Sequence, residues 1–383
     1  MTPGISISGI AIASCLGTTL EAHRVAFAEG RTGLRLLSEA GLEPPWCDLS
    51  AGWIEPRSLL ARRLYAPASQ LAMFLARAAV ADAGIAPGTL RNAWVLVASS
   101  RGNAAGWLDP WPGRRPSRLM AASNSMHGEI AAAVSIDLGI RGPYHVLANG
   151  CSAGLDALGW AFHLLRAGLA PYVLVVSVDL PLARPLLEVF RNTGALSHNN
   201  RNDPYASDST GFLPGEGGAA FIVEREADSA RSRARILGYW ANADAEEPVG
   251  APADGAMIAE LLEAARLELK RPIRALAPHA TGTRASARAE TAALRTVFDG
   301  TPPSLHLLKP FTGHALGASG ALDAAILADH LQHGELPPNL PGLTPPDPRF
   351  RLPHEAEPIG REEIVLKLSS GMGGRNAIVA LAR

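Results

Sequence analysis

Short apolar runs rich in β-branched residues alternate with longer helical stretches along this chain of 383 residues. Several runs are apolar on both faces, which is typical of strands covered by helices on both sides. Residues 68–84 and 257–269 carry apolar residues three and four positions apart, as amphipathic helices do. This alternation predicts a layered α/β protein. The expected strands are residues 5–14, 92–100, 171–180, 218–226, 234–243, 363–370 and 376–382.

The chain divides into two parts at a charged stretch that ends near residue 232. We expect one unit over residues 1–232 and a second over 233–383, which opens with the strand-like "ARILGYWANADA". Both parts hold strands and helices in a similar order. We therefore predict two α/β halves related by an internal duplication.

Composition excludes several classes of function. Acidic and basic residues nearly cancel, to a net charge of −1, which argues against a nucleic-acid binder. Three cysteines without a CxxC pair form neither a disulfide framework nor a zinc site. No run of 18 apolar residues predicts a membrane span, and the first residues lack the basic start of a signal peptide. We expect a soluble, cytoplasmic protein.

One of the three cysteines stands at the entrance of a helix. In "LANGCSAGLDALGWAFHLLRAG", Gly150 and Gly154 leave space around Cys151 and permit a sharp turn into a strongly apolar helix. The helix N-terminus would stabilise a thiolate and lower the pKa of the thiol. From these residues alone, Cys151 is either a nucleophile or a small buried hydrophobic residue.

Two of the eleven histidines lie on glycine-rich turns. His279 opens "HATGTRASARAE", and His314 lies in "LKPFTGHALGASGALDAAI". A cysteine and two histidines at the ends of such elements form a candidate catalytic group. Of the others, His163 is expected in the core of a helix and His330 on the surface.

Five ordered motifs resemble those of the β-ketoacyl-acyl-carrier-protein synthases, the condensing enzymes of the thiolase fold. They are "NGCSAG", "GFLPGEGGAAFIVERE", "HATGTRASARAE", "KPFTGHALGASG" and "SSGMGGRNAIVAL", and the start "ISISGIAIASCLGTTLEAHRVAFAEGRTGLRLL" is also similar. The resemblance covers nearly the whole chain. It implies a layered αβαβα core made of the two halves.

The resemblance also implies catalytic roles. Cys151 would accept the acyl group, while His279 and His314 would stabilise the enolate formed by decarboxylation of a malonyl thioester. Lys309 and Glu290 fall on an ion pair that supports the histidines. The reaction would be a decarboxylative Claisen condensation in fatty-acid or polyketide-type chain elongation.

Further positions would contact the substrates. Thr281 and Thr283 fall where the family binds the pantetheine arm. Ser370 and Met372 stand where the family usually has phenylalanines. The first of these positions would supply an oxyanion-hole N–H, together with that of Cys151.

The chain also departs from the family pattern. Ala280 replaces the glycine that usually follows the first histidine, Ala287 replaces a common aspartate, and Leu368 replaces an asparagine. The missing aromatic gate leaves the chain length and the order of substrate binding open. Two alternatives stay open as well: a thiolase-fold acyltransferase, or a pocket-shaping, chain-length-type subunit of a ketosynthase heterodimer.

The implied chemistry requires no metal or redox cofactor, because two imidazole donors stabilise the enolate. The substrates would arrive on the phosphopantetheine arm of an acyl carrier protein. Exposed arginines are candidates for its docking site, namely Arg114, Arg115, Arg118 and the "RSRAR" segment. The family resemblance further implies a homodimer, or a heterodimer with a ketosynthase-like subunit.

Overall fold

The protein is described by a computed structural model over residues 4–60, 64–86, 88–104, 123–124, 126–225 and 231–383. Within these residues, ten strands form one sheet in the order β10-β9-β13-β14-β8-β1-β7-β6-β4-β5. Their bounds are β1 Ile5–Ala13, β4 Trp94–Ala98, β5 Tyr144–Leu147, β6 Tyr172–Asp179, β7 Gly217–Arg225, β8 Ala234–Ala243, β9 Ile273–Ala277, β10 Ser304–Leu305, β13 Ile364–Gly371 and β14 Arg375–Ala382. Each of the seven strands expected from the sequence is among them.

The sheet consists of two halves with the same topology. Numbered within its own half, each set of five strands follows the order 3-2-4-5-1. The parallel pairs also match. In each half the second strand pairs parallel with the third and the fourth: β4 with β5 and β6, and β9 with β10 and β13. The remaining neighbours in each half are antiparallel. The halves join through a short antiparallel contact between β1 and β8. This repeat confirms the duplicated, layered fold.

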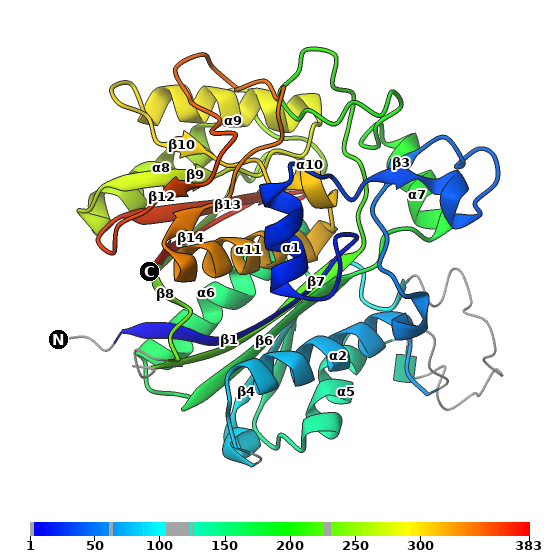
Figure 1. Cartoon of the computed structure of the whole chain (residues 1–383), viewed down its shortest axis with the longest axis vertical. Coiled ribbons are helices and arrows are strands. Elements are labelled where there is room, and N and C mark those ends of the chain that lie inside the picture. The colour runs from blue at the N-terminus through cyan, green and yellow to red at the C-terminus, as the bar shows by residue number, and fades with distance from the viewer. Residues whose placement is uncertain (1–3, 61–63, 87, 105–122, 125, 226–230) are drawn as a thin grey trace.

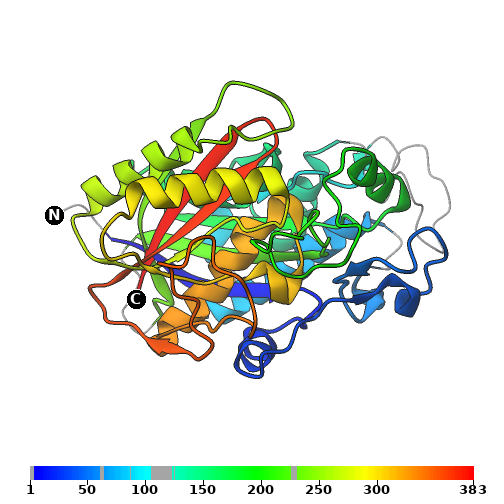
Figure 2. The same cartoon turned by 90° about the horizontal axis from the view of Figure 1, so that it is seen from above.

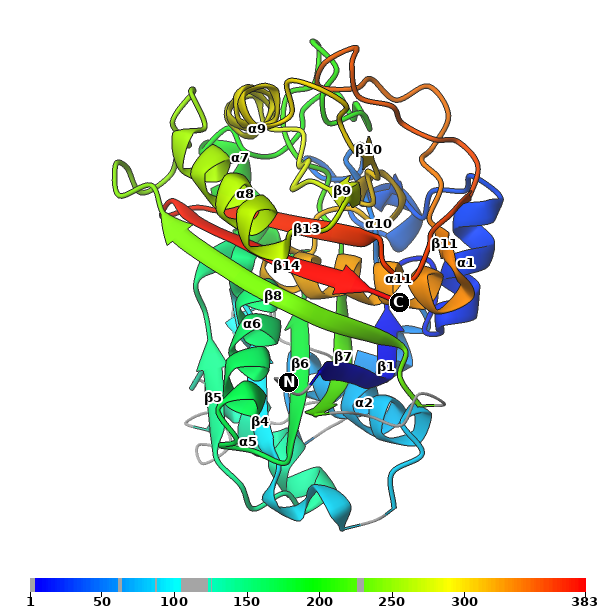
Figure 3. The same cartoon turned by 90° about the vertical axis from the view of Figure 1, so that its left-hand side faces the viewer.

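Helices fill the space between and outside the two halves of the sheet (Figures 1 and 3). α6 and α11 lie between the halves, α2 and α5 cover the outer face of one, and α8 and α9 cover the outer face of the other. Figure 2 looks from above onto α8 and α9. The bounds are α1 Leu20–Ala28, α2 Pro67–Asp82, α5 Glu129–Leu138, α6 Ala153–Arg166, α7 Arg184–Asn192, α8 Ala256–Leu269, α9 Arg284–Val297, α10 Lys309–Thr312 and α11 Ser319–His333. The result is the αβαβα order of layers.

The two central helices approach each other through glycine. A Cβ atom added at Gly154 of α6 would lie 2.8 Å from the backbone nitrogen of Ala321 on α11. One added at Gly320 of α11 would lie 2.8 Å from Leu155 Cγ on α6. Neither position has room for a methyl group. Glycine at both therefore allows the N-terminal ends of the two helices to lie in direct contact. These ends carry the candidate site.

Smaller elements complete the fold. The short strands are β2 Arg35–Leu36, β3 Ser50–Ala51, β11 Glu335–Leu336 and β12 Glu357–Pro358, paired as β2 with β3 and β11 with β12. Two expectations about histidines were wrong. His163 is exposed on α6, and His330 is buried on α11, where its ring contacts Glu335 at 3.0 Å.

The proposed docking arginines fall into two groups. Arg114, Arg115 and Arg118 lie outside the described residues. In the "RSRAR" segment, Arg231 pairs with Glu224 and Arg233 pairs with Asp82, so these two side chains are engaged within the chain. Among the described residues, no helix is both long and apolar enough to span a membrane.

Candidate active site

Cys151 lies where β5 turns into α6. It occupies a single 3-10 turn, Gly150–Ser152, directly before the helix. Gly150 has φ +75°, and a Cβ atom there would lie 3.2 Å from the carbonyl oxygen of Met372. Glycine is therefore required both by the backbone conformation and by the close approach of the Met372 turn.

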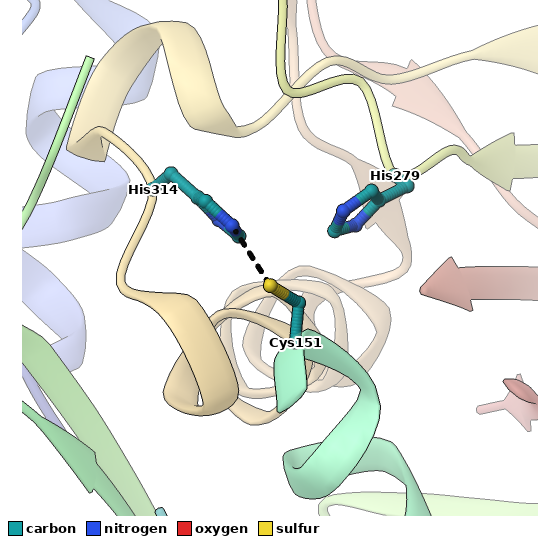
Figure 4. A group of neighbouring side chains, drawn as sticks. All are labelled: Cys151, His279 and His314. Carbon is teal, nitrogen blue, oxygen red and sulfur yellow. Dashed lines mark hydrogen bonds between the residues drawn. The ribbon is translucent and has the colours of Figure 1, made fainter. Parts of the chain in front are cut away.

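His314 faces Cys151 from the turn between α10 and α11. Its Nε2 lies 3.2 Å from the Cys151 sulfur, and its Nδ1 lies 2.9 Å from Ser319 Oγ (Figure 4). The backbone of His314 is held on both sides: its N–H donates to Leu213 O, and its carbonyl accepts from the Gly215 N–H. The glycine-rich segment before β7 thus fixes the position of this imidazole.

His279 approaches the sulfur from the opposite side, at the end of β9 (Figure 4). Its ring centroid lies 5.4 Å from that of His314, with the two planes at 84°. Glu290 on α9 accepts hydrogen bonds from the backbone N–H groups of His279 at 2.5 Å and Ala280 at 2.9 Å. The buried Nδ1 of His279 has no hydrogen-bond partner among the described residues.

Burial determines the protonation of all three groups. It raises the pKa of the Cys151 thiol from 9.0 to about 11, although Lys309 and Arg101 act in the other direction. The expectation of a lowered thiol pKa was therefore wrong, because loss of solvation outweighs the nearby positive charges. Burial lowers the pKa of His279 and of His314 well below 6.5, and Lys309 lowers both further. The resting site holds a neutral thiol and two neutral imidazoles.

A buried group of charges lies beneath the histidines. Asp323 on α11 accepts from Lys309 Nζ at 3.1 Å and from Lys367 Nζ at 2.7 Å. The expected ion pair of Lys309 with Glu290 was wrong, since Glu290 binds backbone N–H groups and the Tyr205 hydroxyl instead. Spacing around the two histidine motifs did not distinguish Asp323 from Glu290, because both follow a histidine on a helix.

The peptide groups around the sulfur also differ from expectation. The backbone N–H that contacts the Cys151 sulfur is that of Met372. Ser370, the expected donor, lies two residues earlier within β13, still paired with Asn376 of β14. The turn that follows brings Met372 over Cys151, so the two candidate oxyanion-hole donors are the N–H groups of Cys151 and Met372.

A cavity of about 550 Å³ opens onto the sulfur and both imidazoles. Its volume falls in the range of sites for small organic ligands. Thr281, Thr283, Ser370 and Met372 all line it, as expected for substrate-binding residues. Aromatic, aliphatic and cationic side chains also line it, among them Phe190, Phe212, Leu316 and Arg101.

The same three residues also form a possible soft-cation site. The donor atoms of Cys151, His279 and His314 all lie within 4.8 Å of one another. Thiolate and imidazole are ligands that Zn²⁺ prefers. The thiol is protonated at neutral pH, however, so a metal would have to displace that proton before it could bind.

Sequence reasoning missed Asp323, Lys367 and Tyr205. The rarity of lysine in this sequence could have pointed to Lys367, and through it to its partner Asp323. The chain has only three lysines among its 35 basic residues, and two of them, Lys309 and Lys367, meet at Asp323. A residue type so rarely used is informative wherever it falls in an apolar strand.

Comparison with known proteins gives matches to both halves of the chain. The N-terminal domain of β-ketoacyl synthase matches residues 50–229, and its C-terminal domain matches residues 233–342. The chain is 29% identical to the tetracenomycin polyketide synthase ketoacyl synthase alpha subunit of Streptomyces glaucescens, over 99% of this chain and 97% of that protein. It is 30% identical to 3-oxoacyl-[acyl-carrier-protein] synthase 2 of Rhizobium meliloti, over 99% and 98%.

Solved structures share the fold. The ishigamide ketosynthase/chain length factor superimposes with a TM-score of 0.84 and 24% identity, over 100% of this chain and 99% of that one. A type II polyketide ketosynthase, in complex with its acyl-carrier protein and bound to the hexaketide, gives a TM-score of 0.83 and 21% identity over the full length of both. With the two domain matches and the relatives that align along its whole length, this chain belongs to the β-ketoacyl synthase family.

Proposed function

We propose that this protein catalyses decarboxylative Claisen condensation of an acyl thioester, held on Cys151, with malonyl-acyl-carrier protein. The observation that carries the proposal is the 3.2 Å contact of the Cys151 sulfur with His314 Nε2, beside a second neutral imidazole, in one cavity. A thiol next to a base is suited to accept an acyl group. Two neutral imidazoles are suited to stabilise an enolate.

Acyl loading begins with proton transfer. As the Cys151 sulfur attacks the thioester carbonyl, its proton passes to His314 Nε2. The carbonyl oxygen becomes an oxyanion between the N–H groups of Cys151 and Met372. The intermediate then expels the carrier thiolate, which takes the proton back from His314. The acyl group remains on the sulfur and His314 is neutral again.

Condensation begins with loss of carbon dioxide. When the bond to the malonyl carboxylate breaks, its electron pair forms an enolate whose oxygen accepts N–H bonds from His279 and from His314. For this step His314 is the Nε2–H tautomer, and its Nδ1 accepts from Ser319 Oγ. The enolate carbon then attacks the acyl carbonyl on Cys151 and forms the new carbon–carbon bond. Collapse of the tetrahedral intermediate expels the Cys151 thiolate. One proton from solvent restores the thiol, and the β-ketoacyl product leaves on its carrier.

This scheme needs no metal or redox cofactor, since the imidazoles supply the stabilisation that a Lewis acid would otherwise give. The substrates enter on a phosphopantetheine arm that passes Thr281 and Thr283. Arg284 and Arg288 are exposed on α9 beside this entrance, and Arg284 lines the cavity. We place the docking site of an acidic acyl carrier protein there.

The alternatives are a thiolase-fold acyltransferase and a pocket-shaping subunit of a ketosynthase heterodimer. Acyl transfer requires only one base, so a second neutral imidazole on the same cavity favours decarboxylation. A pocket-shaping subunit would not need a nucleophile in contact with a base. Both alternatives make distinct predictions in a loading experiment.

The test uses the whole chain, wild type and Cys151→Ala, with acyl-carrier thioesters of several chain lengths. Intact-protein mass spectrometry should show an acyl adduct on the wild type and none on the variant. Addition of malonyl-carrier to the loaded enzyme should then release carbon dioxide and a β-ketoacyl product.

Each alternative has its own outcome. An adduct without decarboxylation would establish the acyltransferase. The absence of an adduct at every chain length, alone and with a ketosynthase-like subunit, would establish the pocket-shaping role.

A further inference from the structure

We propose that Lys367 is a positioning residue of this active site: its ammonium group ties the peptide that carries His279 to the buried Lys309–Asp323 pair. The inference rests on the proposed function, because the step it serves is decarboxylation at His279. Lys367 does not touch the cavity, so it acts through His279 and not on the substrate.

The contacts of Lys367 lead directly to the histidine turn. The side chain is 0% exposed on β13, in the middle of the sheet. Its Nζ donates to the carbonyl oxygen of Pro278 at 2.8 Å and pairs with Asp323 Oδ2 at 2.7 Å. Pro278 immediately precedes His279, so this hydrogen bond fixes the peptide from which the imidazole projects.

The use of lysine here is itself informative. Of the three lysines in the chain, Lys270 is exposed after α8, while Lys309 and Lys367 share one carboxylate. All other basic side chains are arginines. A compact ammonium fits between a carbonyl and a carboxylate inside a sheet, where a planar guanidinium with five donors would leave N–H groups unpaired.

The turn that Lys367 holds is strained. Ala280 has φ +46°, a left-handed conformation that is unfavourable for a residue with a Cβ atom. Glu290 holds the N–H groups of His279 and Ala280 from one side, and Lys367 holds the preceding carbonyl from the other. Together the two contacts keep His279 in place despite the strain.

Lys367 also contributes charge to the site. The ionisable groups around the His279 turn are Glu290 on α9, Tyr205, Lys309 on α10, Asp323 on α11, Lys367 on β13, Cys151 before α6 and His314. After burial, the charges of Lys309 and Lys367 lower the pKa of both histidines. Burial also lowers the pKa of Lys367 to about 8. The positive charge of Lys367 therefore adds to the effect of burial and of Lys309, and this charge is lost as the pH rises above about 8.

The experiment compares Lys367→Met with Lys270→Met as the matched control. Two rates are measured: acyl loading of Cys151 by intact mass, and carbon dioxide release from malonyl-carrier between pH 5 and 10. We expect K367M to load at nearly the wild-type rate and to decarboxylate roughly tenfold to a hundredfold more slowly, as for a misplaced catalytic group. Its acid limb should move to higher pH, because the two histidines lose one of the positive charges that lower their pKa. K270M should match the wild type in all respects.

A second pair of variants addresses the strain. Ala280→Gly removes the unfavourable conformation, so it should restore part of the decarboxylation rate when combined with K367M. If K367M does not fold, Lys367→Gln keeps a donor for the Pro278 carbonyl without the charge, and it should show the same shifted acid limb. Unchanged rates and an unchanged pH profile in K367M or K367Q would overturn the proposal. A wild-type protein that neither loads nor decarboxylates would instead refute the proposed function.

Discussion

At the scale of single residues, Cys151 is a protonated thiol that depends on His314. Its pKa is raised from 9.0 to about 11, so at pH 9 about one sulfur in a hundred would be ionised. Alkylation of Cys151 by iodoacetamide, followed by peptide mass spectrometry, should therefore show no inflection between pH 6 and 9. Cys47, which is half-buried, provides an internal reference in the same digest. An inflection near pH 7 would mean that the helix N-terminus outweighs burial after all.

Substitution of the two histidines should affect different steps of the reaction. His314 touches the sulfur, and in the proposed mechanism it serves both loading and decarboxylation, whereas His279 serves only decarboxylation. We expect His279→Ala to load normally and to lose about 10²–10³-fold in carbon dioxide release, the usual effect of removing one oxyanion donor. His314→Ala should be slow in both assays. Equal loss of loading in the two variants would contradict this division.

The site residues that could be identified from the sequence are those whose neighbouring residues need a particular backbone conformation. Cys151 and His314 each follow a glycine at positive φ, and such turns are visible as sequence motifs. Ser370 was the wrong donor because it is still paired with β14, and the turn that contacts Cys151 comes after it. The register of strand pairing depends on the folded structure and cannot be read from a motif. Lys367 was missed because its partners lie 44 and 89 positions away in the chain.

At the scale of elements, the site depends on the close contact of α6 with α11. Cys151 lies just before α6 and His314 just before α11, so the separation of the two helix N-termini sets the distance between sulfur and imidazole. The apolar run after Cys151 predicted α6. It could not predict that α6 meets α11, because the contact is made by glycines, which carry no periodic signal.

Gly154→Ala should push the two helices apart. Its methyl group would lie 2.8 Å from Ala321 N and 2.9 Å from Gly317 O, both backbone atoms that cannot move aside independently. We expect acyl loading to fall about 100-fold, since a shift near 1 Å has that effect on a catalytic contact. Gly128→Ala is the matched control, because no atom lies within 4 Å of its added methyl group. Normal loading in G154A would show that the helix contact does not set the catalytic distance.

At the scale of the whole molecule, duplication explains how the site arises. Cys151 comes from the first half of the chain, and both histidines come from the second. The sequence predicted two halves because their strands and helices occur in a similar order. It could not show that the halves share one continuous sheet, since the β1–β8 contact involves only three residue pairs. Our division at residue 232 stays a prediction about independent units.

One edge of this sheet requires a partner. β5 is the outermost strand of the first half, hydrogen-bonded in the described residues to β4 alone. Large apolar side chains are exposed on it and on the neighbouring helices: Tyr144 by 47%, Ile136 on α5 by 70% and Trp160 on α6 by 53%. An unpaired edge flanked by apolar residues is a template for pairing with another chain, and a two-fold axis lets a strand pair with its own copy. We therefore expect the chain to self-associate through β5.

Light scattering coupled to size-exclusion chromatography should give about twice the monomer mass of 40.1 kDa. Ile136→Lys combined with Tyr144→Lys places charges at the centre of this edge, and burying them in a dimer would be unfavourable, so the double variant should elute as a monomer. Leu267→Lys is the matched control, because Leu267 is 60% exposed on α8, at the opposite face of the layers. A wild-type chain that is monomeric at micromolar concentration would exclude self-pairing, and mixing it with a ketosynthase-like subunit would then show whether a heterodimer covers the edge instead.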